Sequence, residues 1–282
     1  MSKAAWFLVL TNPISSRGWT TSGVSMLDDF TSLPAAGWIR TVDVFDELGS
    51  TNDHAIRTAS DPRPHPRLVI CNRQLSGRGR GANRWWVSEG ALTFSVVIEP
   101  QVLGIPADRW PTLSVAVGGA ICEALAPCIP SSDVRLKWPN DVFADGRKLG
   151  GILVEVPQVT PARLVIGIGI NVANLVRNAP PEVQARMTSL ADLTAHPPSR
   201  REVLELVLAQ LKTDLGHLVS DPLSLARKWR QRCLLAGRTV TLNDGIRTLS
   251  GACQGIDDDG AVRIYTEFGP QRCFSGSVEA FE

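Results

Sequence analysis

Residues 71–90 of this chain read CNRQLSGRGRGANRWWVSEG. Glycine alternates with arginine from Gly77 to Gly81, and Trp85 and Trp86 follow. Glycine lets backbone N–H groups approach an anion, and arginine adds planar donors that match phosphate and carboxylate oxygens. Apolar runs typical of strands lie on both sides of the stretch. The stretch is therefore predicted to be a loop between two strands. One interpretation is a solvated basic segment, or one that contacts RNA. The other is a loop that surrounds a phosphate-bearing ligand.

Composition and charge limit what this basic loop can do. The chain has 29 lysines and arginines against 28 aspartates and glutamates, a formal net charge of +1. Domains that bind nucleic acid through general electrostatics carry a large basic excess. The arginines of the loop are therefore a local feature that suits a small anionic ligand better. A chain of 282 residues, 44% of them hydrophobic, is long enough for one sizeable core and a small accessory domain.

The cysteines and histidines show no metal-binding pattern. The six cysteines form no Cys-x-x-Cys pair and the four histidines do not cluster with them, so a zinc site is not expected. Cysteines without a pairing pattern favour a reducing, cytoplasmic location.

The first 40 residues are predicted to be an N-terminal extension of unknown role. Their apolar run, 4–10, is too short to span a membrane, and no small-residue cleavage site follows it. Pro13, Pro34 and several glycines and serines interrupt the segment, which shows no pattern of two helices. We therefore expect neither membrane insertion nor a helix-turn-helix that would bind DNA.

Strand and helix signals begin after this extension. Polar and apolar residues alternate over 41–46, which is typical of a half-buried strand. Ser50 and Asp53 then fit a capping box at the start of a helix. The stretch 110–126 is apolar and rich in alanine and glycine, which predicts a buried helix of several turns.

The second half of the chain continues with strands, helices and then closely spaced turns. An Asp-Gly turn within 142–156 predicts a β-hairpin, and 164–172 is predicted to be a central strand interrupted by two glycines. Ser199 and Glu202 fit a second capping box. From 238 onward, short strands separated by turn residues predict a small β-barrel.

Together with the glycine–arginine loop, four further motifs resemble the catalytic core of the biotin protein ligases. The resemblance covers residues 42 to about 275. Besides the glycine–arginine loop, it is carried by Gly49-Ser50-Thr51-Asn52, Lys137-Trp138-Pro139-Asn140-Asp141, Gly146 to Glu155, and Gly167-Ile168-Gly169-Ile170-Asn171-Val172. It implies an α+β fold with the mixed-sheet catalytic domain of biotin and lipoate ligases, which is similar to that of class II synthetases, and a small C-terminal β-barrel. The implied domains are an extension over 1–40, a catalytic domain over 41–233 and the barrel over 234–282.

The resemblance also implies roles for individual residues. Those expected around biotin are Ser50, Thr51, Asn52, Gln74, Gly77, Arg78, Lys148, Gly151 and Gly167. Those expected at ATP or the adenylate are Arg80, Arg84, Trp85, Lys137, Asn140 and Asn171. Lys148, Arg80 and Arg78 are the implied catalytic residues. Asp141 is expected either to bind Mg²⁺ or to hold Lys148.

The loop departs from the family pattern at one position. Where the family has an arginine that contacts phosphate, this chain has Asn83. The neighbouring Arg84 offers a substitute, but its side chain starts from a different backbone position.

The resemblance implies a two-step ligase. The biotin carboxylate attacks the α-phosphorus of ATP, and a lysine of a biotin carboxyl carrier domain then attacks the mixed anhydride. Biotin, ATP and Mg²⁺ are the implied ligands, no protein nucleophile is required, and a homodimer is one expectation for the assembly. Three alternatives stay open at this point: a lipoate or octanoate ligase or transferase of the same fold, a biotin-responsive repressor, and a non-enzymatic RNA-binding protein.

Overall fold

The structure is a computed structural model that describes residues 9–10, 30, 38–81, 83–86, 88–176 and 179–282. The predicted extension over 1–40 lies for the most part outside these residues. The chain divides into two compact units, Met1–Pro100 with Leu153–Gly169, and Gln101–Ile152 with Ile170–Glu282. Two strands run from one unit into the other, and each unit is described separately below.

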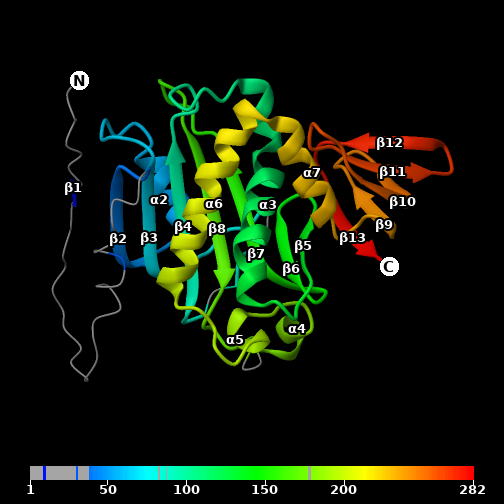
Figure 1. Cartoon of the computed structure of the whole chain (residues 1–282), viewed down its shortest axis with the longest axis horizontal. Coiled ribbons are helices and arrows are strands. Elements are labelled where there is room, and N and C mark those ends of the chain that lie inside the picture. The colour runs from blue at the N-terminus through cyan, green and yellow to red at the C-terminus, as the bar shows by residue number, and fades with distance from the viewer. Residues whose placement is uncertain (1–8, 11–29, 31–37, 82, 87, 177–178) are drawn as a thin grey trace. The chain divides into compact units, whose positions relative to one another are not determined.

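The first unit is built on a sheet of mixed direction. Its strands follow the order β1-β2-β3-β4-β8, with β1 parallel to β2, β2 parallel to β3, and β3 antiparallel to β4. Figure 1 shows β2, β3 and β4 side by side. Every residue of β4 and β8 is buried, as expected for their continuous apolar runs. The strand bounds are Val9–Leu10 for β1, Thr41–Leu48 for β2, Arg67–Gln74 for β3, Ala91–Ile98 for β4 and Leu164–Asn171 for β8.

Helix α2, Thr51–Arg57, begins where the sequence predicts. Ser50 is its N-cap, and its hydroxyl accepts a hydrogen bond from the Asp53 backbone N–H at 3.3 Å. In a capping box the Asp53 carboxylate would bind the Ser50 backbone N–H. Its observed partner is instead Arg78, with which it forms an ion pair. The predicted cap is confirmed, and its acidic residue connects the helix to the glycine–arginine loop.

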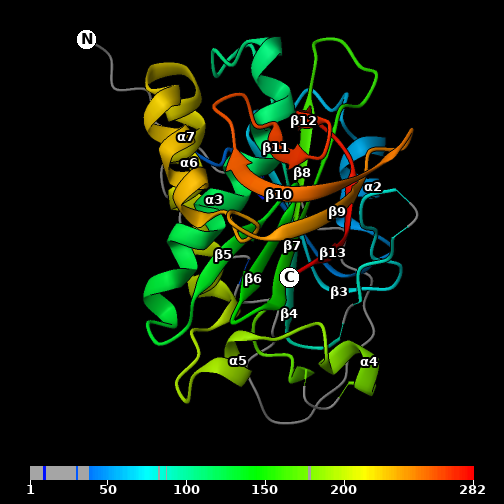
Figure 2. The ribbon, with the colours of Figure 1, turned by 90° about the vertical axis from the view of Figure 1, so that its right-hand side faces the viewer.

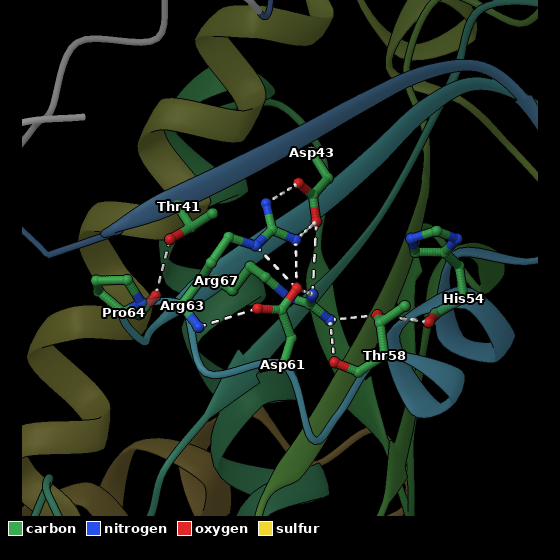
Figure 3. A network of polar contacts seen from close by, with 8 residues as sticks. All are labelled: Thr41, Asp43, His54, Thr58, Asp61, Arg63, Pro64 and Arg67. Carbon is green, nitrogen blue, oxygen red and sulfur yellow. Dashed lines mark hydrogen bonds and ion pairs between the residues drawn. The ribbon is translucent and has the colours of Figure 1, made fainter. Parts of the chain in front are cut away.

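The segment after α2 is fastened to β2 and β3 by a buried network of charges, which Figure 3 shows. The Arg67 side chain is fully buried, and one of its nitrogens lies 3.3 Å from an Asp61 oxygen and 3.6 Å from an Asp43 oxygen. Arg63 donates to both oxygens of Asp43, at 2.7 and 3.0 Å. Burying a guanidinium is favourable only when it is paired and hydrogen-bonded, so these carboxylates are required for the start of β3 to lie where it does.

The second unit carries the long helices together with strands β5, β6 and most of β7. Strands β7, β6 and β5 pair antiparallel in that order. Their bounds are Val134–Lys137 for β5, Asp141–Ala144 for β6 and Arg147–Glu155 for β7. The helices are α3 (Leu113–Leu125), α4 (Pro181–Gln184), α5 (Leu190–Leu193), α6 (Arg200–Ser220) and α7 (Pro222–Arg232), with 3₁₀ turns η1 (Ala107–Thr112) and η2 (Ala126–Cys128).

The predicted buried helix is confirmed as α3, with a later start. Pro111 lies within the preceding 3₁₀ turn, and regular helix begins at Leu113. The continuous helical stretch Ala107–Cys128 is long and apolar enough to cross a membrane by length and composition alone, but most of it is buried inside the protein. A core helix of a water-soluble fold has the same composition, so this is weak grounds for a membrane span.

Two local predictions in the second unit are confirmed. The β6–β7 hairpin turns at Asp145 and Gly146, whose φ angles of 49° and 75° are those of a tight turn with both central residues left-handed. Ser199 caps α6, and the Glu202 side chain binds back to the Ser199 backbone N–H at 2.8 Å, which completes the capping box.

The final five strands form an open sheet rather than the closed barrel that the sequence predicts. Their order is β12-β11-β10-β9-β13 and all neighbours are antiparallel. Figure 2 shows them as a twisted sheet. Pro270 lies in the edge strand β12 and has no N–H to donate, as is common at an edge, while β13 returns to pair with β9. The bounds are Thr239–Asn243, Thr248–Ile256, Val262–Thr266, Gly269–Cys273 and Ser277–Phe281 for β9 to β13.

We expect Asp43→Asn to lower the free energy of unfolding by about 3 kcal/mol, because it removes one of the two carboxylate charges that pair with the buried Arg67 and its neighbour Arg63 and leaves only Asp61. Glu47 on the same strand is the matched control, since its ion pair with Arg73 is about half exposed and its loss costs less than about 1 kcal/mol. Urea unfolding of Asp43→Asn and Glu47→Gln measures both. Equal effects of the two substitutions would contradict a structural role of the buried network.

Candidate functional site

The glycine–arginine loop is a small hairpin in the first unit. Strand β3 extends to Gln74, so the first four residues of 71–90 are strand rather than loop. The Trp85 N–H donates to the Gly77 carbonyl at 3.0 Å, and the Gly79 N–H donates to the Asn83 carbonyl at 2.8 Å. The Asn83 side chain donates to the Arg80 carbonyl at 3.0 Å. The residue that departs from the family pattern therefore closes the turn of this hairpin.

Arg78 ties the loop to two other elements of the first unit. Its guanidinium donates to both oxygens of Glu155, at 3.1 and 2.7 Å, and its Nε lies 2.7 Å from the Asp53 carboxylate. The bidentate bond from Glu155 raises the pKa of Arg78 above its usual value. By contrast, neither Arg80 nor Arg84 forms an ion pair within the described residues. Two of the three predicted arginines thus keep their charge uncompensated by an acidic side chain.

Asn52 lies at the centre of a polar network that starts at the N-terminus of α2. Its side chain is buried and donates to Glu155 at 2.8 Å and to the Leu153 carbonyl at 3.1 Å. It accepts a bond from the hydroxyl of Ser95 at 2.6 Å. All these partners belong to the first unit, so the amide fixes α2 against β4 and the end of β7.

Thr51 and Gln74 continue the same network. The Gln74 side-chain oxygen accepts from the Thr51 backbone N–H at 2.7 Å and lies 3.2 Å from its hydroxyl. The hydroxyl of Ser95 also reaches the Thr51 hydroxyl, at 2.8 Å. The predicted residues Thr51, Asn52, Gln74 and Arg78 therefore form one continuous set of contacts.

Sequence analysis assigned no role to the two residues that link this set, Ser95 and Glu155, although Glu155 ends one of the motifs. Ser95 is a fully buried polar residue within the apolar strand β4, and Glu155 ends the apolar strand β7. A polar side chain in a buried strand requires a partner, and this signal was available in the sequence.

The strand glycines Gly167 and Gly169 provide space, but protein side chains use it. A Cβ on Gly167 would lie 2.1 Å from the Asn52 side-chain oxygen. A Cβ on Gly169 would lie 2.7 Å from the Trp85 ring. The two glycines thus make room for two predicted site residues, Asn52 and Trp85. The expected contact of Gly167 with biotin stays a prediction.

In the second unit, Lys148 lies at the start of β7 and pairs with Asp141 of β6. Its ammonium nitrogen is 2.7 Å from the Asp141 carboxylate. Its backbone N–H donates to the Arg186 carbonyl at 2.8 Å, and its carbonyl accepts from Thr188 at 2.9 Å. Of the two expected roles for Asp141, the observed contact is the one that holds Lys148. Within the described residues no three acidic, histidine or cysteine side chains gather as a metal site. The expected contact of Asp141 with Mg²⁺ stays a prediction.

Three hydrogen bonds hold the turn at residues 137–140 in place. Trp138 is buried and donates to the Gly260 carbonyl of the C-terminal sheet at 3.0 Å. Asn140 donates to the Ile152 carbonyl at 2.9 Å, and Ser114 of α3 donates to the Pro139 carbonyl at 3.1 Å. The half-buried Gly151 of β7 pairs with Asp141, the residue after Asn140. The predicted ligand contacts of Asn140 and Gly151 stay predictions.

Lys137 and Asn171 occupy different environments. The Lys137 ammonium lies 5.4 Å from the centre of the Phe143 ring, and burial lowers its pKa below the usual value. Asn171 is fully buried, donates to the Thr188 carbonyl at 2.9 Å and accepts from Asn174 at 2.9 Å. Lys137 thus offers a partly desolvated cation, whereas the observed partners of Asn171 are all protein groups.

Comparison with known proteins identifies a family and individual proteins to which this chain is similar. Residues 45–171 match the Biotin/lipoate A/B protein ligase family. The chain is 35% identical over 231 residues to a biotin–[acetyl-CoA-carboxylase] ligase of Mycobacterium tuberculosis, which covers 80% of this chain and 84% of that protein. It is 29% identical to the bifunctional ligase/repressor BirA of Bacillus subtilis, covering 83% of this chain and 72% of BirA.

A solved structure agrees with these relatives. The biotin protein ligase from Aquifex aeolicus in complex with biotin and ATP matches with a TM-score of 0.73 and 28% identity. The match covers 86% of this chain and 98% of that one.

We expect Glu155→Gln to loosen the loop while it keeps an acceptor for Asn52. Removing the charge opposite Arg78 should raise the rate of trypsin cleavage after Arg80 and Arg84 about fivefold. This is the effect of about 1 kcal/mol for a pair whose side chains are 38% and 26% exposed. Mass spectrometry of the peptides measures the rate. Glu47→Gln, which breaks an ion pair elsewhere in this unit, is the control and should leave the cleavage rate unchanged. Cleavage of Glu155→Gln at the wild-type rate would show that the Arg78–Glu155 ion pair does not hold the loop.

Gly167→Ala should destabilise the protein by about 1–3 kcal/mol, because the added methyl group overlaps the Asn52 side chain. Gly216→Ala is the matched control: Gly216 is exposed within α6 with open space around it, and the substitution should stabilise by about 0.5–1 kcal/mol. Thermal unfolding of both variants measures the difference. Effects of the same sign would be inconsistent with a filled space above Gly167.

Proposed function

This chain belongs to the biotin protein ligases, and we propose that it activates biotin with ATP and transfers the biotinoyl group to a lysine of a biotin carboxyl carrier domain. The observation that carries the proposal is the similarity, over most of both chains, to a protein named as a biotin–[acetyl-CoA-carboxylase] ligase. The four motifs that suggest the same family all fall within the described residues.

In the proposed biotin site, the network around Asn52 acts as a preformed support. Ser50, Thr51 and Gln74 supply hydroxyl, N–H and amide groups for the ureido ring, and Gly77 with Arg78 continues the site along the loop. Their existing hydrogen bonds limit the rotamers that they can adopt. A site whose groups are already oriented pays less entropy when the ligand binds, which supports this assignment.

The proposed activation step brings two anions together. A biotin carboxylate oxygen attacks the α-phosphorus of ATP and forms a new P–O bond, while the bond to the bridging oxygen breaks and pyrophosphate leaves. Lys148, Lys137, Arg80 and Arg84 are the cations proposed to offset this charge, and the observed pair with Asp141 supports Lys148 as a cation held in place. Arg84 takes the phosphate role of the arginine that is replaced by Asn83.

In the second step, the amine of the acceptor lysine attacks the acyl carbon of biotinoyl-AMP. An amide bond forms, the acyl–oxygen bond to AMP breaks and a proton leaves the nitrogen. Trp85 and the loop hairpin are proposed to cover the adenylate and slow its hydrolysis. No nucleophile of the protein enters either step.

Mg²⁺ is proposed to arrive with ATP rather than to reside in the protein. Magnesium is commonly held by substrate phosphates with one or two carboxylates. Asp141, the expected ligand, has its carboxylate paired with Lys148, so no step is assigned to a metal held by the protein.

The cellular setting follows from the same proposal. The acceptor is the carrier domain of a biotin-dependent carboxylase, and the proposed location is the cytoplasm. A homodimer and the absence of DNA binding stay predictions.

Mass spectrometry of the protein incubated with Mg-ATP and biotin, with lipoate in a parallel reaction, tests the first step. Biotinoyl-AMP in the biotin reaction alone is the expected result. An adenylate formed only from lipoate would transfer the assignment to the lipoate ligases, and no adenylate in either reaction would reject the proposed activity.

Lys148→Gln should lower the rate of biotinoyl-AMP formation at least about 100-fold, because it removes the proposed cation at the reacting carboxylate. Lys212, an exposed lysine of α6, is the control, and Lys212→Gln should retain full activity. Thermal unfolding of both variants separates lost chemistry from lost fold. A Lys148→Gln enzyme with near wild-type rates would remove this residue from the mechanism.

A further inference from the structure

An aromatic residue of the C-terminal sheet contacts a predicted nucleotide-binding lysine. The Lys137 ammonium lies 5.1 Å from the centre of the Phe281 ring and 5.4 Å from that of Phe143. The two rings are 6.4 Å apart and meet edge to face, at 78°. Lys137 and Phe143 belong to the paired strands β5 and β6, whereas Phe281 ends β13, so the cation lies against two rings from different sheets of one unit.

The position of Phe281 is set by its neighbours in the structure. Phe281 pairs with Val240 of β9, and the flanking residues Thr239 and Glu282 exchange backbone hydrogen bonds at 3.2 and 3.0 Å. The Arg238 guanidinium lies over the same ring, 5.5 Å from its centre. The Trp138 bond to Gly260 fastens the residue after Lys137 to the same sheet. The ring is therefore held against the lysine by contacts on both sides.

We propose that Phe281 is a positioning residue of the nucleotide site, which holds the Lys137 ammonium in the orientation that binds the ATP phosphates. The inference rests on the proposed function and extends it, because it makes the C-terminal sheet a working part of ATP binding.

The physical reason lies in the lysine side chain. A free lysine has four rotatable bonds and a strongly hydrated ammonium, so much of its rotamer entropy is lost when it binds a phosphate. Two ring faces attract the cation and restrict its rotamers before ATP arrives. Part of the ordering cost is then met in the unliganded protein, which favours ATP binding without any contact between Phe281 and ATP.

Biotin-dependent exchange of pyrophosphate into ATP, measured as a function of ATP and biotin concentration, tests the inference. Phe281→Leu keeps the apolar contact but removes the ring, and we expect the KM for ATP to rise about three- to tenfold. The KM for biotin should stay unchanged, and Phe281→Tyr, which keeps the ring, should behave like wild type. Phe268→Leu is the control, since Phe268 is 84% exposed in a turn of the same sheet.

The outcomes separate the two claims. A wild-type enzyme without exchange rejects the proposed function and the inference with it. An active wild type with an unchanged KM for ATP in Phe281→Leu overturns the inference alone. Equal losses in Phe281→Leu and Phe281→Tyr also overturn it, because they would show that Phe281 acts by packing and not through its ring.

Discussion

The buried amide of Asn52 is the constraint on which the first unit depends. A side-chain amide removed from water must have its donors and acceptor satisfied, and here Glu155, Leu153 and Ser95 satisfy them. These partners lie on two different strands, so the requirement fixes the start of α2 against both. It also requires a residue without a side chain at Gly167, because the amide oxygen occupies the space of a Cβ.

From this amide the same network reaches the glycine–arginine loop. Glu155 binds Asn52 with one carboxylate oxygen and Arg78 with both, so a structural contact and a loop contact share a single side chain. The loop is thereby held through Arg78, while Arg80 and Arg84 form no ion pair within the described residues. In the proposed mechanism, Arg78 anchors the loop and the other two arginines bind phosphate.

In the second unit, two lysine side chains are held in place by different kinds of contact. Lys148 is fixed by the carboxylate of Asp141, and Lys137 by aromatic rings. A carboxylate holds an ammonium by charge and neutralises part of its field, whereas a ring holds it without removing that charge. The two lysines are therefore positioned in different ways. The tight β6–β7 turn at Asp145 and Gly146 brings Asp141 and Lys148 onto neighbouring strands.

Local signals in the sequence determined the elements and the family. Ser50, Ser199 and the Asp145-Gly146 turn act within a few residues of the chain, so their predictions hold. The order of the motifs determined the ligase assignment for the same reason, since it is read along the chain. Tertiary structure alone decided the partners: Asn52 and Glu155 are 103 positions apart, and neither strand period nor capping encodes their meeting. It also decided that the last five strands stay open and that Phe281 lies against Lys137, because these contacts depend on how separate elements pack.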